Sequence, residues 1–238
     1  MKTFRRMLCL ALIAMFLCAS ALPAFAADTR TFYLGGKGTS TVEYIGIELE
    51  EGDKITDVKS SNKKIFTIYS FGKYHTHYID TEYEDEEYES DSYSAEVDIM
   101  LKKKGTANVT YKLNGQTQKI PVKILAYTNP VKTFKLTGLG KTNLASKFKK
   151  TRFVNAKSKK TKAGYMEVTA AKGWKIEYIS FQDSKAQNSR YIYAWDNPVS
   201  SLKMNVPAMK KGRVYYARAR LVNESNGADI YVSYHLSK

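Results

Sequence analysis

Strict alternation of apolar and polar side chains over residues 92–101 constrains the fold more than any other feature of the sequence. The apolar positions are Tyr93, Ala95, Val97, Ile99 and Leu101. Serine and acidic residues stand between them, at Ser94, Glu96 and Asp98. A period of two is typical of a β-strand with one buried face, because successive side chains point to opposite sides of the strand. This segment is therefore predicted to be a half-buried strand.

Further strand-like segments follow along the chain, and no window shows helical periodicity over three turns. Residues 106–113 and 116–125 flank Asn114 and Gly115, which supply the positive φ angles of a type I′ hairpin turn. Other candidate strands are residues 165–168, 174–181, 190–195, 213–222 and 229–236. Short strands separated by turn residues predict an all-β chain built from β-sandwiches.

Residues 1–26 have the composition of a secretory signal peptide. A positively charged start is followed by an apolar run over residues 7–22 and by a small-x-small triplet at residues 24–26. The apolar run is shorter than the roughly 20 residues that a spanning helix needs, which favours cleavage over an uncleaved anchor. We therefore expect a secreted, extracellular protein without a transmembrane segment in its mature chain; association with the cell surface stays an open alternative.

Both cysteines, Cys9 and Cys18, lie inside this predicted signal peptide. The mature chain then has no disulfide, no cysteine nucleophile and no thiolate metal ligand. Such a chain depends on its hydrophobic cores for stability.

Charge divides the rest of the chain into two parts. Residues 28–128 hold 13 Lys and Arg against 17 Asp and Glu, whereas residues 129–238 hold 22 against 6, so the net charges are −4 and +16. The change coincides with Asn129 and Pro130, where the proline keeps its predecessor extended. We predict one domain over residues 28–127 and a second, basic domain over residues 128–238.

Two motifs in the first of these domains resemble those of the bacterial Ig-like group 2 family. In residues 55–68, Val-Lys-Ser-Ser-Asn leads into an apolar strand, and residues 103–110 read Lys-Lys-Gly-Thr-Ala-Asn-Val-Thr. The resemblance implies an Ig-like β-sandwich of the kind used for adhesion, spacing or display. A short turn joins the two motifs in that family, whereas here an acidic insertion at about residues 73–92 separates them.

The end of the second domain is similar to fibronectin type III modules. Residues 209–223 contain the pattern Lys-Gly-x-x-Tyr-x-x-Arg-x-Arg, and residues 226–234 resemble the following turn and last strand. Along residues 215–221, the set predicted to face the core is Tyr215, Ala217, Ala219 and Leu221. Arg218 and Arg220 then face solvent or the sheet edge. Residues 131–163 match the family poorly, but the expected architecture is two tandem Ig-like/fibronectin-like β-sandwich domains.

The acidic insertion is densest at residues 78–93, which hold eight carboxylates and four tyrosines. Carboxylate oxygens suit Ca²⁺, although the run lacks the spacing and the glycine of a calcium-binding loop. A dense carboxylate run also repels itself and tends to stay extended, so a solvated hairpin tip or loop is the alternative. A third interpretation is pairing with a basic surface, either of this chain or of a partner.

A second candidate metal site lies just before this run. His75 and His77 fall on the same side of a predicted strand, with Asp80 and Glu82 close in sequence. Imidazole and carboxylate groups in this pattern can hold Zn²⁺ or Cu²⁺. The alternative is a pair of exposed polar histidines. No cofactor is expected beyond this possible Zn²⁺ or Cu²⁺ site and the possible Ca²⁺ site.

Residues 132–162 contain eleven Lys and Arg and no acid. The candidate contacts are Lys147, Lys149, Lys150, Arg152, Lys157, Lys159, Lys160 and Lys162. Outside the cytoplasm, such a segment meets anionic cell-wall polymers and glycans, or another surface protein. Export argues against a specific nucleic-acid partner. The alternative is a solvated charged loop.

Aromatic residues offer a different kind of contact. The candidate platform for stacking on a glycan comprises Trp174, Tyr191, Tyr193 and Trp195. Tyrosine is also a favoured strand residue, so packing in the core or across strands is the alternative.

Nothing in the sequence points to catalysis. It contains neither Gly-x-Ser-x-Gly nor His-Glu-x-x-His, and its paired carboxylates occur in the acidic insertion. We expect a non-catalytic extracellular binding or adhesion module whose basic domain contacts an anionic polymer. The alternatives are a metal- or carbohydrate-binding module and a spacer without a ligand.

Overall fold

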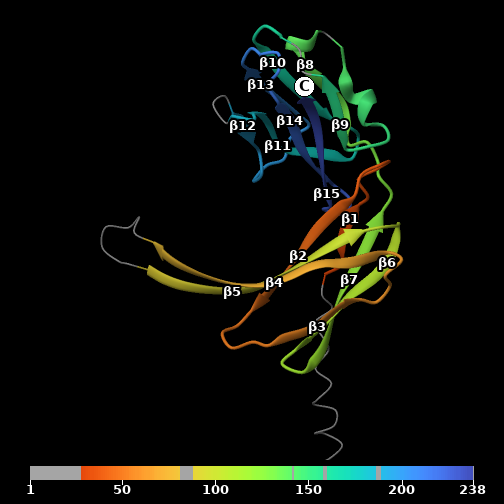
Figure 1. The fold of residues 1–238 in the computed structure, drawn as a ribbon, viewed down its shortest axis with the longest axis vertical. Helices are drawn as coiled ribbons and strands as arrows, with labels where there is room; N and C mark the ends of the chain where they lie inside the picture. Colours follow the sequence, from red (N-terminus) through yellow and green to blue (C-terminus); the bar gives the residue numbers. More distant parts are fainter. Residues whose placement is uncertain (1–27, 81–87, 141, 158–159, 186–188, 238) are drawn as a thin grey trace, which may run out of the picture.

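The computed structural model describes residues 28–237 apart from residues 81–87, 141, 158–159 and 186–188. The predicted signal peptide lies outside these residues. The described part of the chain forms strands and two short 3-10 helices, arranged in four sheets that build two sandwich-like domains (Figure 1). The prediction of an all-β chain with two tandem sandwiches is confirmed.

Domain one packs a four-stranded sheet, β1-β7-β6-β3, against a three-stranded sheet, β2-β5-β4. Its strands are β1 (Arg30–Tyr33), β2 (Thr41–Leu49), β3 (Ile55–Ser60), β4 (Phe66–Asp80), β5 (Tyr88–Leu101), β6 (Gly105–Leu113) and β7 (Gln116–Leu125). Phe66, Val97, Ile99 and Val109 are fully buried between the sheets. The alternation in β5 therefore has the predicted cause, since its apolar side faces this core.

The turn between β6 and β7 also forms as predicted. Asn114 and Gly115 have φ angles of 52° and 84°. The side chain of Asn114 accepts a hydrogen bond from the Lys54 amide at 2.9 Å. The turn is thus fixed both by its own backbone and by its neighbour at the start of β3.

Strands β4 and β5 continue beyond the sandwich as a long hairpin that projects from the side of domain one (Figure 1). Their antiparallel register runs from Phe66 opposite Leu101 to Asp80 opposite Tyr88. The described residues of the acidic insertion lie on this hairpin. Its connecting residues, 81–87, lie outside the described part of the chain.

Domain two packs the three-stranded sheet β13-β10-β8 against the five-stranded sheet β12-β11-β14-β15-β9. Its elements are β8 (Val131–Leu136), η1 (Thr137–Leu139), η2 (Leu144–Phe148), β9 (Phe153–Lys157), β10 (Gly164–Ala170), β11 (Trp174–Asp183), β12 (Arg190–Tyr193), β13 (Ser201–Val206), β14 (Tyr215–Asn223) and β15 (Asp229–Ser237). The core-facing set predicted for residues 215–221 is confirmed, because all four side chains are at most 2% exposed.

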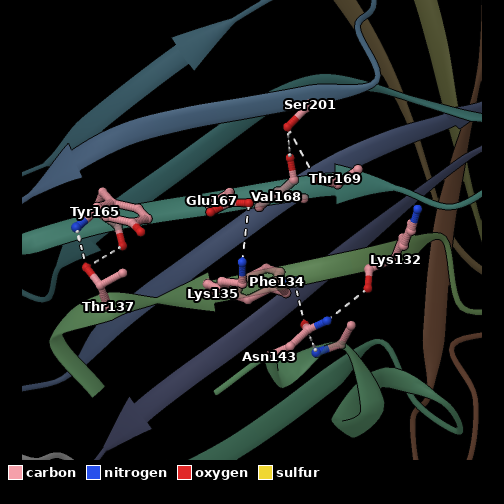
Figure 2. A network of polar contacts seen from close by, with 11 residues as sticks. Lys132, Phe134, Lys135, Thr137, Asn143, Tyr165, Glu167, Val168, Thr169 and Ser201 are labelled. Atoms are coloured by element: carbon pink, nitrogen blue, oxygen red, sulfur yellow. Dashed lines mark hydrogen bonds and ion pairs between the residues drawn. The ribbon is translucent and has the colours of Figure 1, made fainter. Parts of the chain in front are cut away.

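Residues 131–163, which gave little strand signal, are organised around Asn143 (Figure 2). Its Oδ1 accepts hydrogen bonds from the amides of Ala145 and Phe134, both at 3.0 Å, and its Nδ2 donates to the Lys132 carbonyl at 3.1 Å. These bonds cap η2 and tie it to β8. Phe148 at the end of η2 then packs on Phe134, with ring centroids 5.0 Å apart.

The two domains meet along β1 and the residues that follow it. Tyr33 packs on Trp174, with ring centroids 5.3 Å apart, and its hydroxyl accepts a hydrogen bond from Asn226 Nδ2 at 3.2 Å. Backbone bonds continue the contact, since the Lys37 amide donates to the Lys150 carbonyl at 2.7 Å. We call this contact the domain joint. It extends the core of domain two onto a residue of domain one.

Candidate functional site

Six of the eight candidate polymer-binding residues are exposed lysines of domain two. They are Lys147, Lys149, Lys150, Lys157, Lys160 and Lys162. The first three stand on or just after η2, where the Asn143 cap and the buried Phe148 fix the backbone. Lys160 and Lys162 flank Thr161, whose amide donates to the Met209 carbonyl at 3.0 Å. The lysines thus project from anchored backbone, and we call the six the lysine surface. Lys159 lies outside the described residues.

The carboxylates of domain two are engaged elsewhere. Domain two holds six Asp and Glu, and five of them form ion pairs within the domain. The pairs are Lys135–Glu167, Lys175–Glu224, Arg213–Asp183, Arg220–Glu177 and Arg220–Asp229. No member of the lysine surface has an ion pair with a described carboxylate. Its positive charge is therefore not neutralised by the described part of the chain.

Arg152, the remaining candidate, is not part of that surface. Its side chain is 11% exposed, and Nη1 lies 3.0 Å from Oε1 of Glu43 in domain one. Its backbone amide also donates to the Gly35 carbonyl at 3.0 Å. Arg152 thus belongs to the domain joint, and its assignment as a polymer contact is wrong, because burial between the domains removes it from external ligands.

Glu43 shows how strongly this joint is desolvated. Burial raises the pKa of the Glu43 carboxyl, and the attraction of Arg152 lowers it only in part. The ion pair therefore does not fully offset the cost of removing the carboxylate from water.

A cleft of about 580 Å³ opens beside the joint, between β1, β2 and the turn that joins β14 to β15. Arg220 lies on its wall, with Nε 2.9 Å from both Glu177 Oε2 and Asp229 Oδ2. Burial raises the pKa of Glu177, and Arg220 opposes that rise. The two carboxylates here share one arginine, so the arrangement is an ion-pair network on the wall of the cleft.

The histidine pair has a different partner from the one expected. Asp91 Oδ1 lies 2.7 Å from His75 Nε2 and 3.0 Å from His77 Nδ1. Strand register explains this, because His77 stands directly opposite Asp91 in the β4–β5 ladder. Tyr93 stacks on His75 with ring centroids 4.5 Å apart. Asp91 was not among the residues predicted for this site, since local spacing in the sequence says nothing of cross-strand neighbours.

The structure does not describe the side chains of the other two proposed metal ligands. Glu82 lies outside the described residues, as does the side chain of Asp80. Among the described residues, no set of three or more His, Cys, Asp or Glu side chains has an arrangement suited to a metal ion. The hydrogen bonds of Asp91 lower its own pKa, with His75 making the larger contribution and His77 the smaller.

Of the four aromatic candidates, one is buried and three are exposed. Trp174 is 5% exposed and packs against Tyr33, so it cannot belong to a surface platform. Tyr191, Tyr193 and Trp195 are exposed at the edge of the five-stranded sheet. Tyr193 and Trp195 contact Tyr178 of β11, whose ring centroid lies 5.8 Å from that of Tyr193 and 6.2 Å from that of Trp195. Tyr178 was not among the candidates, although it stands opposite Tyr193 in the strand register.

Comparison with known proteins gives matches among solved structures alone. No family model and no curated protein matches the chain. Domains 5–6 of the S-layer protein SbsC are similar at 10% identity and a TM-score of 0.28, over 89% of this chain and 95% of that one. A multi-domain segment of titin is similar at 12% identity and a TM-score of 0.22, over 88% of this chain and 60% of that one. At such low TM-scores, the architecture is better defined by the sheets themselves.

The sequence predicts no transmembrane segment in the mature chain. Where the chain is described, none of its helices has the length and apolar character needed to cross a membrane.

Proposed function

We propose that this protein is a non-catalytic extracellular binding module whose domain two contacts an anionic polymer of the cell envelope or matrix through the lysine surface. One observation carries the proposal. Six exposed lysines project from anchored backbone in a region of net charge +16, while five of that region's six carboxylates are paired elsewhere.

The remaining expectations fit this role. Residues 1–26 have the features of an export signal. An exported basic domain meets the anionic polymers of the cell envelope and matrix. In this proposal, domain one is a bacterial Ig-like group 2 domain and domain two a fibronectin type III-like domain. Both families serve mainly in adhesion, spacing and display, and the chain would be retained at the cell surface by its charge.

The β4–β5 hairpin carries the acidic insertion, so it is the part of this chain that could compete with an external polyanion for the lysine surface. In the described parts of the two regions, no ion pair joins them; the Glu43–Arg152 bridge is the ion pair that links the domains. The described part of the hairpin instead engages its own strands, through Asp91 and through the hydrogen bond from Ser70 to Asp98. The proposal takes an external polyanion, and not this hairpin, to be the ligand of the lysines.

Retention on purified cell wall tests the proposal. We expect the protein to bind wall that carries its anionic polymers, and to be released as NaCl rises from about 0.05 to about 0.5 M, because salt screens exposed charges. Wall stripped of those polymers should not retain it. Binding that ignores salt, or that survives stripping, would contradict the proposal.

A matched pair of triple variants locates the contact. Lys147→Gln, Lys149→Gln and Lys150→Gln together should weaken retention by about fivefold per lysine at low salt. Lys102→Gln, Lys103→Gln and Lys104→Gln remove the same charge from exposed positions of domain one. If the two triple variants lose retention equally, net charge and not the lysine surface is responsible.

A further inference from the structure

The exposed rings at the edge of domain two form a corner. Tyr193 and Trp195 stand nearly perpendicular, at 87°, with centroids 5.4 Å apart. They are 60% and 56% exposed, so one face of each ring is open to solvent. A pocket of about 550 Å³ lies within this corner, lined by Tyr193, Ala194, Trp195, Asp196 and Asn197. Two aromatic walls and two polar side chains thus surround one space.

The corner continues along the edge strand. Tyr191 lies nearly parallel to Tyr193, at 6°, with centroids 5.9 Å apart, and is 43% exposed. The three rings therefore form a row over β12 and the residues after it. A row of rings offers several adjacent apolar surfaces, as an extended ligand with repeating units requires.

The rings are held in place before any ligand arrives. Tyr178, the cross-strand neighbour of Tyr193, contacts both Tyr193 and Trp195. It also meets Tyr231 edge-on, with the centroids of Tyr178 and Tyr231 5.8 Å apart. The Ala194 amide donates to the Glu177 carbonyl at 2.6 Å, which fixes the backbone between the two corner rings. Gln182 donates to the Tyr191 hydroxyl. Such preorganisation lowers the entropy lost when a ligand binds.

The polar groups of the pocket indicate the kind of ligand. Asp196 accepts hydrogen bonds and Asn197 both donates and accepts, a combination that suits hydroxyl groups. Asp196 is also the one acid of domain two outside the ion pairs described above, so it repels an anion at this place. An aromatic corner with a carboxylate and an amide therefore favours a neutral, hydroxyl-rich ring.

We propose that Tyr193, Trp195, Asp196 and Asn197 form a binding site for a neutral hexopyranose unit of a glycan. The apolar face of the sugar stacks on an aromatic ring, and its hydroxyls hydrogen-bond to Asp196 and Asn197. Tyr191 contacts the neighbouring unit of the chain. Tyr178 is a positioning residue, because it contacts both Tyr193 and Trp195. This site is separate from the lysine surface in both residues and chemistry.

Neutral oligomers of glucose, mannose, galactose and N-acetylglucosamine are the probes for this site. Titration into the purified protein at about 0.5 M NaCl should shift the tryptophan emission to the blue, because stacking removes Trp195 from water while Trp174 is already buried. We expect at least one oligomer to bind with the same affinity at low and high salt. Failure of all four sugars to bind overturns the proposal.

Three variants decide which residues act. Trp195→Ala and Asp196→Asn should each weaken binding of that oligomer by about tenfold or more. Tyr74→Ala removes a ring that is 53% exposed in domain one and should leave binding unchanged. Unchanged binding in Trp195→Ala, with native circular dichroism, overturns the proposal. Since Asp196→Asn keeps the shape of the side chain, it tests the site even if Trp195→Ala unfolds.

Two further measurements distinguish a glycan site from attraction to the lysine surface and from self-association. The triple variant at Lys147, Lys149 and Lys150 should bind the oligomer as the unaltered protein does, so the lysine surface and the aromatic corner can fail independently. In sedimentation, the unaltered protein should not self-associate through the aromatic corner, so Trp195→Ala should leave its oligomeric state unchanged. Self-association through the corner would mean that a second copy occupies it, and would overturn the glycan assignment.

Discussion

Arg152 Nη1 lies 3.0 Å from Glu43 Oε1, and this ion pair crosses from domain two to domain one. The side chains are 11% and 27% exposed, so each offsets the other's charge in a largely desolvated environment. Two residues 109 positions apart in the chain thus share one buried site. The stability of the joint depends on both.

Replacing Arg152 by methionine should destabilise the protein by about 1–3 kcal/mol at pH 7, because it leaves the Glu43 carboxylate desolvated without its partner. The double variant Glu43→Gln with Arg152→Met should recover a large part of that loss, since no uncompensated charge remains. Urea unfolding of the two single variants and the double variant completes the cycle. Additive losses would show that the two side chains do not interact.

The same site predicts a dependence on pH. Burial raises the folded-state pKa of Glu43 above its ordinary value of 4.5. The protonated form is thus favoured by folding, so this stabilisation is present below pH 4.5 and is lost as pH rises through the raised pKa. Relative to the unaltered protein, Glu43→Gln should therefore gain stability between about pH 4 and about pH 7. A loss of stability of Glu43→Gln relative to the unaltered protein as pH rises would contradict the sign.

Gly36 and Gly38 offer a matched test of the backbone at the joint. Both have positive φ angles, 87° and 72°, but a Cβ on Gly36 would overlap the Lys150 carbonyl, whereas a Cβ on Gly38 would meet open space. Gly38→Ala should cost about 1 kcal/mol from backbone strain alone. Gly36→Ala should cost at least about twice as much, measured by urea unfolding. Equal losses of stability would mean that the backbone at Lys150 does not pack closely against Gly36.

Asp91 should hold the outer part of the β4–β5 hairpin together. Asp91→Asn weakens the contacts with His75 and His77, so amides of the ladder near His77 should exchange hydrogen severalfold faster. Glu96→Gln, on the opposite face of β5, is the control. Hydrogen bonds from His75 and then His77 lower the pKa of Asp91, so their contribution is present above about pH 3.8 and disappears as pH falls through the lowered pKa. Unaltered exchange in Asp91→Asn would rule out this role.

Local patterns were sufficient for part of the fold. The alternation in β5 and β14 identified strands correctly because one face of each packs on a core, and a period of two records that directly. The turn at Asn114 and Gly115 was equally local, because the residue types themselves permit the required φ angles.

Contacts between residues far apart in the sequence could not be predicted from local patterns. Residues 131–163 are so rich in lysine that their apolar anchors, Phe134 and Phe148, gave no periodic signal. Trp174 packs on Tyr33 of the other domain, and Arg152 pairs with Glu43, and neither contact can be inferred from local sequence. The pairing of His77 with Asp91 depends on the register of a hairpin that neither residue determines.

The direction of β1 has a mechanical consequence. β1 runs parallel to β7, with Arg30 opposite Val122 and Tyr33 opposite Leu125. These are the first and last strands of domain one, so tension applied at its two ends pulls them in opposite directions along their own axes. The hydrogen bonds between them are then loaded together in shear, whereas an antiparallel arrangement would let them peel apart one by one. Domain one is thereby suited to bear load between an attachment at one end and a pull at the other.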